Sequence, residues 1–243
     1  MLISELFYSL QGEGKRIGFP SFFIRTNYCN LRCKFSGGNL CDSAYTSWEP
    51  KDKRNLGKID ISEIIDKYNY YYPVDIVITG GEPTLQTNEL ILLCQRIKEL
   101  EKSIFITLET NGTIIGDFLN FIDLVSVSPK LKSSVPFGTK YEQQHNKIRI
   151  NISNLRHLNK LHNENKFDIQ WKFVICKEDD IFEILELKDK IGFRNSDVFL
   201  MPEGISAEEI NNKRQMVADL CKKNFFNYTD RLQILCWGNE RGY

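Results

Sequence analysis

Short apolar segments alternate along this chain with segments of helical periodicity, and this alternation limits the folds available to it. The segments that resemble buried strands are rich in β-branched or aromatic residues and end at turn residues. They cover residues 74–79, 103–109, 121–128, 169–175, 197–201 and 232–237. Strand–helix alternation predicts βαβ units and a mostly parallel sheet. About six such strands fit an α/β fold built as an open, incomplete barrel, and a doubly wound sheet is the alternative.

Helices are expected between these strands. Residues 60–71 open with Asp60 and Glu63 at capping-box spacing, and residues 206–223 open in the same way. Residues 87–100 carry apolar side chains on one helical face. These three segments are the clearest helix predictions in the sequence.

Chain length and composition predict a single domain. The 243 residues, 42% of them hydrophobic and 26% charged, match an ordinary core-forming protein, and about 200–250 residues is usual for one barrel-like α/β domain. We therefore expect residues 1–243 to form one domain, with a cysteine-containing loop at 28–48. The polar, asparagine-rich stretch 131–168 interrupts the alternation and is expected to be an insertion with one or two surface helices.

Charge and terminal sequence favour a cytoplasmic enzyme. The 32 basic and 32 acidic side chains balance, so no net field attracts the protein to nucleic acid or to lipid. The N-terminal sequence lacks the basic start, apolar core and cleavage site of a signal peptide, and no segment reaches the ~18 apolar residues that cross a bilayer. We expect cytoplasmic localisation, reduced cysteines, and neither a nucleic-acid nor a membrane partner.

Three of the seven cysteines lie in one loop, and this clustering points to a metal centre. Cys29, Cys33 and Cys41 all fall within residues 28–48, and soft thiolate ligands favour zinc or iron over magnesium or calcium. Structural zinc normally takes four ligands, and all three histidines lie far away within 131–168. A 4Fe–4S cluster bound by three cysteines would leave one iron open for a ligand. A catalytic cluster is therefore favoured, and a zinc-binding structural or interaction module is the alternative.

At these residues the sequence resembles the radical S-adenosylmethionine (SAM) enzymes. "CNLRC" (29–33) followed by "CDS" (41–43) is similar to their cluster loop, and "TGGEP" (79–83) is similar to the motif that holds the methionine amine of SAM. Further segments resemble the 7-carboxy-7-deazaguanine synthases: "FYSLQGEG" (7–14), "ETNGT" (109–113), "SPK" (128–130), "MPEG" (201–204) and "WGNERG" (237–242). Together these segments span nearly the whole chain in the family's order, which makes the combination far more specific than any one of them.

The resemblance implies an activity, a fold and a set of cofactors. The family converts 6-carboxy-5,6,7,8-tetrahydropterin to 7-carboxy-7-deazaguanine with loss of ammonia, a step toward 7-deazapurines such as queuosine. The implied fold is a partial, modified (β/α) barrel that forms a homodimer. The implied cofactors are a 4Fe–4S cluster, SAM and Mg²⁺, with an electron donor of flavodoxin or ferredoxin type. A SAM-derived radical performs the chemistry, so no side chain is assigned as catalytic.

The nearest alternative is another radical SAM enzyme, such as a glycyl-radical activase. Such an enzyme would share the three cysteines and "GGEP", but it would not need "LQGEG" or an arginine in a pterin pocket.

The resemblance also assigns site residues by position. Cys29, Cys33 and Cys41 would bind the 4Fe–4S cluster, and the Ser43 hydroxyl would bind Mg²⁺ together with the substrate carboxylate. The residues expected to bind SAM are Gly80, Gly81, Glu82, Glu109, Asn111, Ser128, Pro129 and Lys130. The residues expected to bind the pterin are Leu10, Gln11, Gly12, Glu13, Arg25, Thr79 and Tyr243. Glu82 would accept a hydrogen bond from the SAM ammonium, the two glycines would let the backbone approach the ligand, and Arg25 would pair with the pterin carboxylate.

Two positions depart from the family's pattern. Seven residues separate Cys33 from Cys41, whereas radical SAM enzymes usually have two residues between these cysteines. The extra residues include "SGGN" (36–39), which can bulge outward because glycine accepts unusual backbone angles, so a looped-out insertion is expected. Ser43 stands where the family more often has threonine, and its hydroxyl preserves a magnesium ligand.

Overall fold

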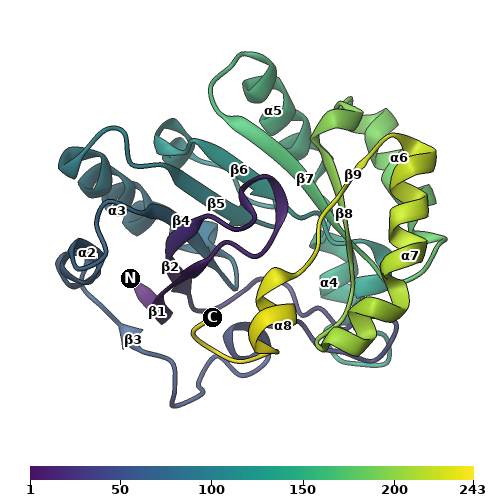
Figure 1. Cartoon of the computed structure of the whole chain (residues 1–243), viewed down its shortest axis with the longest axis horizontal. Coiled ribbons are helices and arrows are strands. Elements are labelled where there is room, and N and C mark those ends of the chain that lie inside the picture. The colour runs from purple at the N-terminus through teal and green to yellow at the C-terminus, as the bar shows by residue number, and fades with distance from the viewer.

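A single open sheet of nine strands forms the centre of the fold (Figure 1). The computed structural model describes residues 1–243. The strands lie in the order β3-β1-β2-β4-β5-β6-β7-β8-β9, so β3 and β9 are the two edges. β1 pairs antiparallel with β2 and β3, whereas every neighbouring pair from β2 to β9 is parallel. The expected α/β fold with a mostly parallel, unclosed sheet is confirmed, with nine strands instead of about six.

The bounds of the elements are as follows. The strands are β1 (Leu2–Leu10), β2 (Pro20–Thr26), β3 (Gly57–Lys58), β4 (Asp75–Gly80), β5 (Ile106–Thr110), β6 (Leu124–Val127), β7 (Asp168–Ile175), β8 (Val198–Pro202) and β9 (Asn227–Tyr228). The α-helices are α1 (Ala44–Ser47), α2 (Ile61–Asn69), α3 (Thr87–Leu100), α4 (Glu142–Ile148), α5 (Ile152–Asn163), α6 (Asp180–Ile191), α7 (Ala207–Asn224) and α8 (Leu232–Trp237). Short 3₁₀ helices are η1 (Gly14–Arg16), η2 (Pro83–Gln86), η3 (Asp117–Phe121), η4 (Lys132–Ser134) and η5 (Asn195–Asp197).

Side chains alternate along the parallel strands between an apolar core and a polar inner face. On β7, Trp171 and Phe173 belong to the hydrophobic core, whereas Lys172 between them lines a cavity on the other face. On β6, Val125 and Val127 belong to the core and Ser126 between them lines the same cavity. This period of two is the geometry of an extended strand. It turns the polar groups of several strands toward one space.

Helices surround the curved sheet, with α2 and α3 near the N-terminal strands and α6 and α7 beside the last parallel strands (Figure 1). The C-terminal helix α8 instead returns to the strands at the N-terminus, where the Leu232 amide donates to the Gly12 carbonyl at 3.0 Å. None of the helices combines the length and the apolar character needed to span a membrane.

Five of the six expected strands are present as β4 to β8, and the sixth prediction is wrong. Residues 232–237 form helix α8, in which Ile234 is buried. A six-residue apolar run is too short for its periodicity to distinguish a buried strand from a buried helical turn. β1 and β2 were not among the six expected strands, although they form the antiparallel part of the sheet.

The three expected helices are present as α2, α3 and α7. The structure confirms the expected bounds of α3. The Ser206 hydroxyl caps α7 by accepting a hydrogen bond from the Glu209 amide at 3.2 Å. Asp60 lies at the N-cap of α2, but its side chain makes no capping hydrogen bond.

The polar stretch 131–168 contains two helices, α4 and α5. α5 buries Leu155 and Leu158 in the core and connects β6 to the parallel strand β7. It therefore serves as a crossover helix of the βαβ pattern. α4 lies beside the loop 28–48, which His145 contacts through the Arg32 amide.

Candidate active site

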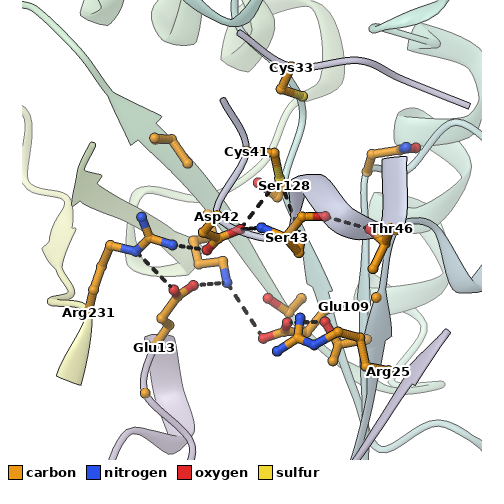
Figure 2. Close-up of a pocket in the computed structure, with 18 of the residues that line it drawn as sticks. Glu13, Arg25, Cys33, Cys41, Asp42, Ser43, Thr46, Glu109, Ser128 and Arg231 are labelled. Carbon is orange, nitrogen blue, oxygen red and sulfur yellow. Dashed lines mark hydrogen bonds and ion pairs between the residues drawn. The ribbon is translucent and has the colours of Figure 1, made fainter. Parts of the chain in front are cut away.

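One cavity on the inner side of the sheet collects almost all of the residues expected at the site (Figure 2). Its wall includes side chains from β2 and from β4 to β8, from the loop 28–48, and from the C-terminal segment 231–243. The expected residues that line it are Leu10, Gln11, Gly12, Glu13, Arg25, Cys29, Cys33, Cys41, Ser43, Thr79, Gly80, Gly81, Glu109, Asn111, Ser128, Lys130 and Tyr243. Only Glu82 and Pro129 are not part of this lining.

A short hairpin accommodates the seven residues between Cys33 and Cys41. Lys34 and Leu40 form an antiparallel bridge, and the Cys41 amide donates to the Cys33 carbonyl at 3.2 Å. Gly38 near the tip has a φ of +100°, a conformation that favours glycine. The extra residues therefore form a hairpin whose Phe35 and Leu40 line the cavity, and the backbones of the two cysteines lie together at its base.

The three thiols lie in the cavity wall as free cysteines. Burial raises the pKa of Cys33 and Cys41, and burial together with Glu82 raises the pKa of Cys29 to about 12. The Leu31 amide donates to Cys29 Sγ at 3.4 Å. The protein by itself thus favours protonated thiols, and a metal that binds them as thiolates releases their protons.

A network of buried ion pairs lies on another side of the cavity (Figure 2). Lys172 pairs with Glu13, and Arg231 pairs with both Glu13 and Asp42. Burial alone would raise the pKa of Glu13, but Lys172 and Arg231 outweigh it, and the pKa is lowered. Lys172 Nζ also lies 3.6 Å from Glu109 Oε1. These groups therefore stay charged because each has an opposite charge beside it.

Glu109 connects the ends of neighbouring strands at the cavity. Its Oε2 accepts a hydrogen bond from the Thr79 hydroxyl at 2.7 Å, and its Oε1 lies 3.4 Å from the donating Gln11 side-chain amide. Three residues expected at the ligand site therefore form one hydrogen-bonded group.

Arg25 has one protein partner and leaves its terminal nitrogens available. Its Nε donates to Glu5 Oε2 at 2.8 Å, and the Tyr45 hydroxyl donates to the same oxygen at 2.8 Å. Arg241 holds the other Glu5 oxygen at 2.7 Å. The guanidinium is thus fixed at Nε, and its two Nη atoms, which make no hydrogen bond to the protein, can receive a planar carboxylate.

Lys130 is the one cation of the cavity wall without a carboxylate partner within 4.0 Å. Its Nζ donates to the Ser128 hydroxyl at 2.8 Å. Arg25, Lys172 and Arg231 each have such a partner. Lys130 is therefore the cation most available to an anionic group of a ligand.

Glu82 lies directly behind the cavity wall, since its neighbour Gly81 and its donor Asn111 both line the cavity. Its carboxylate is completely buried and accepts hydrogen bonds from the Thr84 hydroxyl, the Thr110 hydroxyl and the Asn111 amide, each at 2.7 Å. Oε2 accepts only the Asn111 amide, and a carboxylate oxygen can accept a second hydrogen bond. The contact with the SAM ammonium that the motif predicts therefore stays a prediction.

The glycines before Glu82 serve a close approach between protein segments. A Cβ on Gly80 would lie 2.3 Å from the Thr26 carbonyl oxygen, and one on Gly81 would lie 2.1 Å from the Tyr28 carbonyl oxygen. Both glycines line the cavity. Their missing side chains bring the strand end against the segment that leads into the cysteine loop. The expected approach of the same backbone to a ligand stays a prediction.

Comparison with known proteins agrees with this arrangement. A profile of the Radical SAM superfamily matches residues 23–216. A 7-carboxy-7-deazaguanine synthase of Halobacterium salinarum is 39% identical, over 98% of this chain and 90% of the relative. The chain belongs to the 7-carboxy-7-deazaguanine synthase family of radical SAM enzymes. A family member of Rhodopirellula baltica is 34% identical over 100% of this chain and 88% of its own length. The crystal structure of QueE from Escherichia coli shares the fold, with a TM-score of 0.62, 21% identity, and coverage of 95% of this chain and 93% of that one.

Membership of the radical SAM family implies a 4Fe–4S cluster and SAM, and the cysteine geometry fits such a cluster. All three thiols are free and line one cavity, as is needed of thiolates that hold one iron–sulfur cluster. A structural zinc site normally takes four ligands, and no histidine or fourth cysteine lines this cavity.

Sequence reasoning missed Lys172, Arg231 and Gln233, all of which line the cavity. A signal for Lys172 was present, because a lysine inside the apolar run "IQWKFVI" must find a buried partner. Arg231 and Gln233 were hidden by the incorrect assignment of residues 232–237 as a strand. Gly12 in "LQGEG" makes room for this helix, since a Cβ there would lie 1.8 Å from Gln233 Oε1.

Proposed function

We propose that this chain converts 6-carboxy-5,6,7,8-tetrahydropterin to 7-carboxy-7-deazaguanine with loss of ammonia, as a single radical SAM domain over residues 1–243. One observation carries the proposal: a single cavity joins three free thiols to buried charges that match a polar, carboxylated heterocycle. The full-length identity of 39% to a 7-carboxy-7-deazaguanine synthase supports the same reaction.

The thiol side of the cavity would hold the cofactors. Cys29, Cys33 and Cys41 would bind the 4Fe–4S cluster, which together with SAM supplies the radical chemistry. The cation of Lys130, unpaired within the protein, suits the carboxylate of SAM, and Ser128 orients it through their 2.8 Å hydrogen bond. The backbone at Gly80, Gly81 and Pro129 and the polar groups of Glu109 and Asn111 would complete the SAM site. Glu82 would accept a hydrogen bond from the SAM ammonium, and it also holds the Asn111 amide in place at 2.7 Å.

The charged side of the cavity would recognise the pterin. The free Nη atoms of Arg25 would bind the carboxylate in a forked geometry. The Glu13 carboxylate, whose charge is maintained by Lys172, would accept hydrogen bonds from the guanidine-like edge of the pterin. The Gln11 side-chain amide can both donate and accept there. Leu10, Gly12 and Thr79 would contact the ring system, and Tyr243 would close the pocket from the C-terminal end.

Mg²⁺ would bind between the two sides of the cavity. Magnesium prefers oxygen ligands and retains several waters, and the Ser43 hydroxyl lines the cavity next to the Asp42 carboxylate. The Asp42 carboxylate accepts a hydrogen bond from the Ser43 amide at 2.7 Å, which fixes their relative placement. The substrate carboxylate would supply a further ligand.

The remaining partners follow from the resemblance to the family. We include a flavodoxin- or ferredoxin-type electron donor, a homodimeric assembly and a cytoplasmic location in the proposal. Size-exclusion chromatography with light scattering tests the dimer, and reduction of the cluster by each donor protein tests the electron source.

Anaerobic turnover with product identification tests the reaction. Reconstituted protein is incubated with 6-carboxy-5,6,7,8-tetrahydropterin, SAM, Mg²⁺ and a reductant, and the product mass is determined. We expect 7-carboxy-7-deazaguanine together with released ammonia. Cleavage of SAM without any change in the pterin would instead indicate a different radical SAM reaction.

A further inference from the structure

The polar segment 131–149 contacts the cysteine loop at the residues on either side of Cys33. The Arg32 amide donates to His145 Nδ1 at 3.1 Å, and the Lys34 amide donates to the Ser134 carbonyl at 3.0 Å. Both amides adjoin a cysteine that is expected to bind a metal cluster. The segment therefore constrains the backbone from which the Cys33 thiol projects.

The hydrogen bonds at His145 define one tautomer of its ring. Because Nδ1 accepts from the Arg32 amide, the proton of the neutral imidazole lies on Nε2, where it can donate to the Ser134 hydroxyl at 3.3 Å. The Ser134 hydroxyl in turn donates to the Leu131 carbonyl at 2.7 Å. Each donor in this series of three hydrogen bonds has an acceptor, which is consistent with the proton on Nε2.

Burial keeps this imidazole neutral. His145 is 1% exposed, and burial, reinforced by Arg149 and Lys130, lowers its pKa to about 4. The acceptor at Nδ1 is therefore retained at neutral pH.

A second set of contacts holds the same loop from the side of Tyr141. The Arg32 guanidinium lies 5.5 Å from the centre of the Tyr141 ring, and its Nη1 donates to the Cys29 carbonyl at 2.6 Å. Trp48 packs edge-on against Tyr141 at 5.4 Å and donates through Nε1 to the Cys33 carbonyl at 3.0 Å. Hydrogen bonds thus hold four backbone groups of the cysteine loop: the carbonyls of Cys29 and Cys33, and the amides of Arg32 and Lys34.

We propose that His145 is a positioning residue for the cluster: by holding the Arg32 amide, it sets the direction of the Cys33 thiol. The proposal rests on the proposed role of Cys33 as a cluster ligand. Groups that orient metal ligands without touching the metal strongly affect metal retention. The segment 131–149 would then act as a support for the cluster loop.

Two substitutions at His145 separate the hydrogen bond from the packing. His145→Phe keeps a flat ring and removes the acceptor, whereas His145→Asn offers an amide oxygen near the position of Nδ1. His162→Phe is the matched control, because His162, in α5, is the other buried histidine of the polar stretch. Its Nδ1 lies 3.1 Å from the Phe167 carbonyl, and not beside an amide of the cysteine loop. Each protein is reconstituted anaerobically with iron and sulfide. Iron content, the rate of iron release to a chelator and the electron paramagnetic resonance (EPR) spectrum after reduction are then measured.

We expect His145→Phe to release iron about 10-fold faster than the parent protein, at the lower end of the effect of losing an outer ligand contact, and to show an altered EPR spectrum. His145→Asn should recover much of the parent behaviour. His162→Phe should retain iron and keep the parent spectrum, even where it lowers the melting temperature. Should His145→Phe not fold, Ser134→Ala removes the acceptor for Nε2–H, and we expect a smaller change in the same direction.

The proposal is overturned when His145→Phe, or Ser134→Ala in its place, retains iron and its spectrum like the parent protein. It is also overturned when His162→Phe changes both readouts as much as His145→Phe does. None of these measurements uses the pterin. A parent protein that binds its cluster normally but makes no deazaguanine would refute the proposed reaction and leave the role of His145 standing.

Discussion

The two sides of the cavity hold their charges in different ways. At the thiol side, burial raises the pKa of Cys29, Cys33 and Cys41, so the protein alone disfavours their charged forms. At the other side, Lys172 and Arg231 lower the pKa of Glu13 despite its burial, so charge is present before any ligand arrives. The thiols are therefore neutral in the protein alone, whereas the ion-pair side is preorganised by the charges of the protein itself.

The largest expected effect is loss of the thiol side. Cys41→Ala removes one of three cluster ligands, so we expect SAM cleavage to fall below detection and bound iron to decrease sharply. Chromatographic assay of SAM cleavage and iron analysis measure this. Cys236→Ala, at the exposed cysteine of α8, is the control and should behave like the parent. Full activity of Cys41→Ala would show that another residue completes the site.

The next effect concerns the stability of the ion-pair side. Lys172→Met leaves Glu109 without a charged partner and leaves Glu13 with Arg231 alone, and breaking a buried pair costs about 3–5 kcal/mol of unfolding free energy. Urea unfolding measures the loss. Lys177→Met is the control, because Lys177 is exposed and lies 3.8 Å from exposed Asp179; an exposed pair contributes about 0–1 kcal/mol. Equal losses in both variants would contradict a preorganised ion-pair side.

Substrate affinity provides the third test. Arg25→Ala removes the expected partner of the pterin carboxylate, and we expect binding to weaken by about 2–4 kcal/mol. Anaerobic calorimetry with 6-carboxytetrahydropterin measures the affinity. Arg54→Ala, which removes an exposed arginine paired with Asp52, should bind like the parent. An unchanged affinity in Arg25→Ala would remove this residue from the substrate site.

The smallest expected effect is a change in acid stability at Glu5. Burial alone would raise the pKa of Glu5, but Arg25, with hydrogen bonds from Arg241 and Tyr45, lowers it below 4.5. Its contribution to stability is therefore complete above about pH 4.5 and is lost as the pH falls through the lowered folded-state pKa. Glu5→Gln should flatten the acid side of the unfolding profile, measured by thermal unfolding from pH 6 to pH 3. If the profile of Glu5→Gln ran parallel to that of the parent protein over this pH range, the pKa of Glu5 would not be lowered in the folded state.

Local sequence predicted the residues that belong to short motifs. The three cysteines of the loop 28–48, residues of "LQGEG" and Arg25 line one cavity because a strand end or a loop presents them locally; their roles stay predictions. The ion-pair partners were not predicted, since Lys172 and Arg231 lie 159 and 218 residues from Glu13. Only the curvature of the open sheet and the return of α8 to the N-terminal strands bring them together.

Glu82 shows what a short motif leaves out. Its position after two glycines predicts a contact with SAM, and that contact stays a prediction. The fold adds that the same carboxylate accepts hydrogen bonds of 2.7 Å from Thr84, Thr110 and Asn111. The strand predicted at 232–237 failed because burial of a short apolar run is common to strands and helical turns.

The most direct test of the account is the response of the reduced, reconstituted protein to SAM. We expect about four irons and four sulfides per chain, as a 4Fe–4S cluster requires, and an EPR spectrum that changes when SAM is added because one iron has no protein ligand. A spectrum that SAM leaves unchanged, with a fourth side chain bound to the cluster, would contradict the central claim that three thiols on one side of the cavity hold an open site.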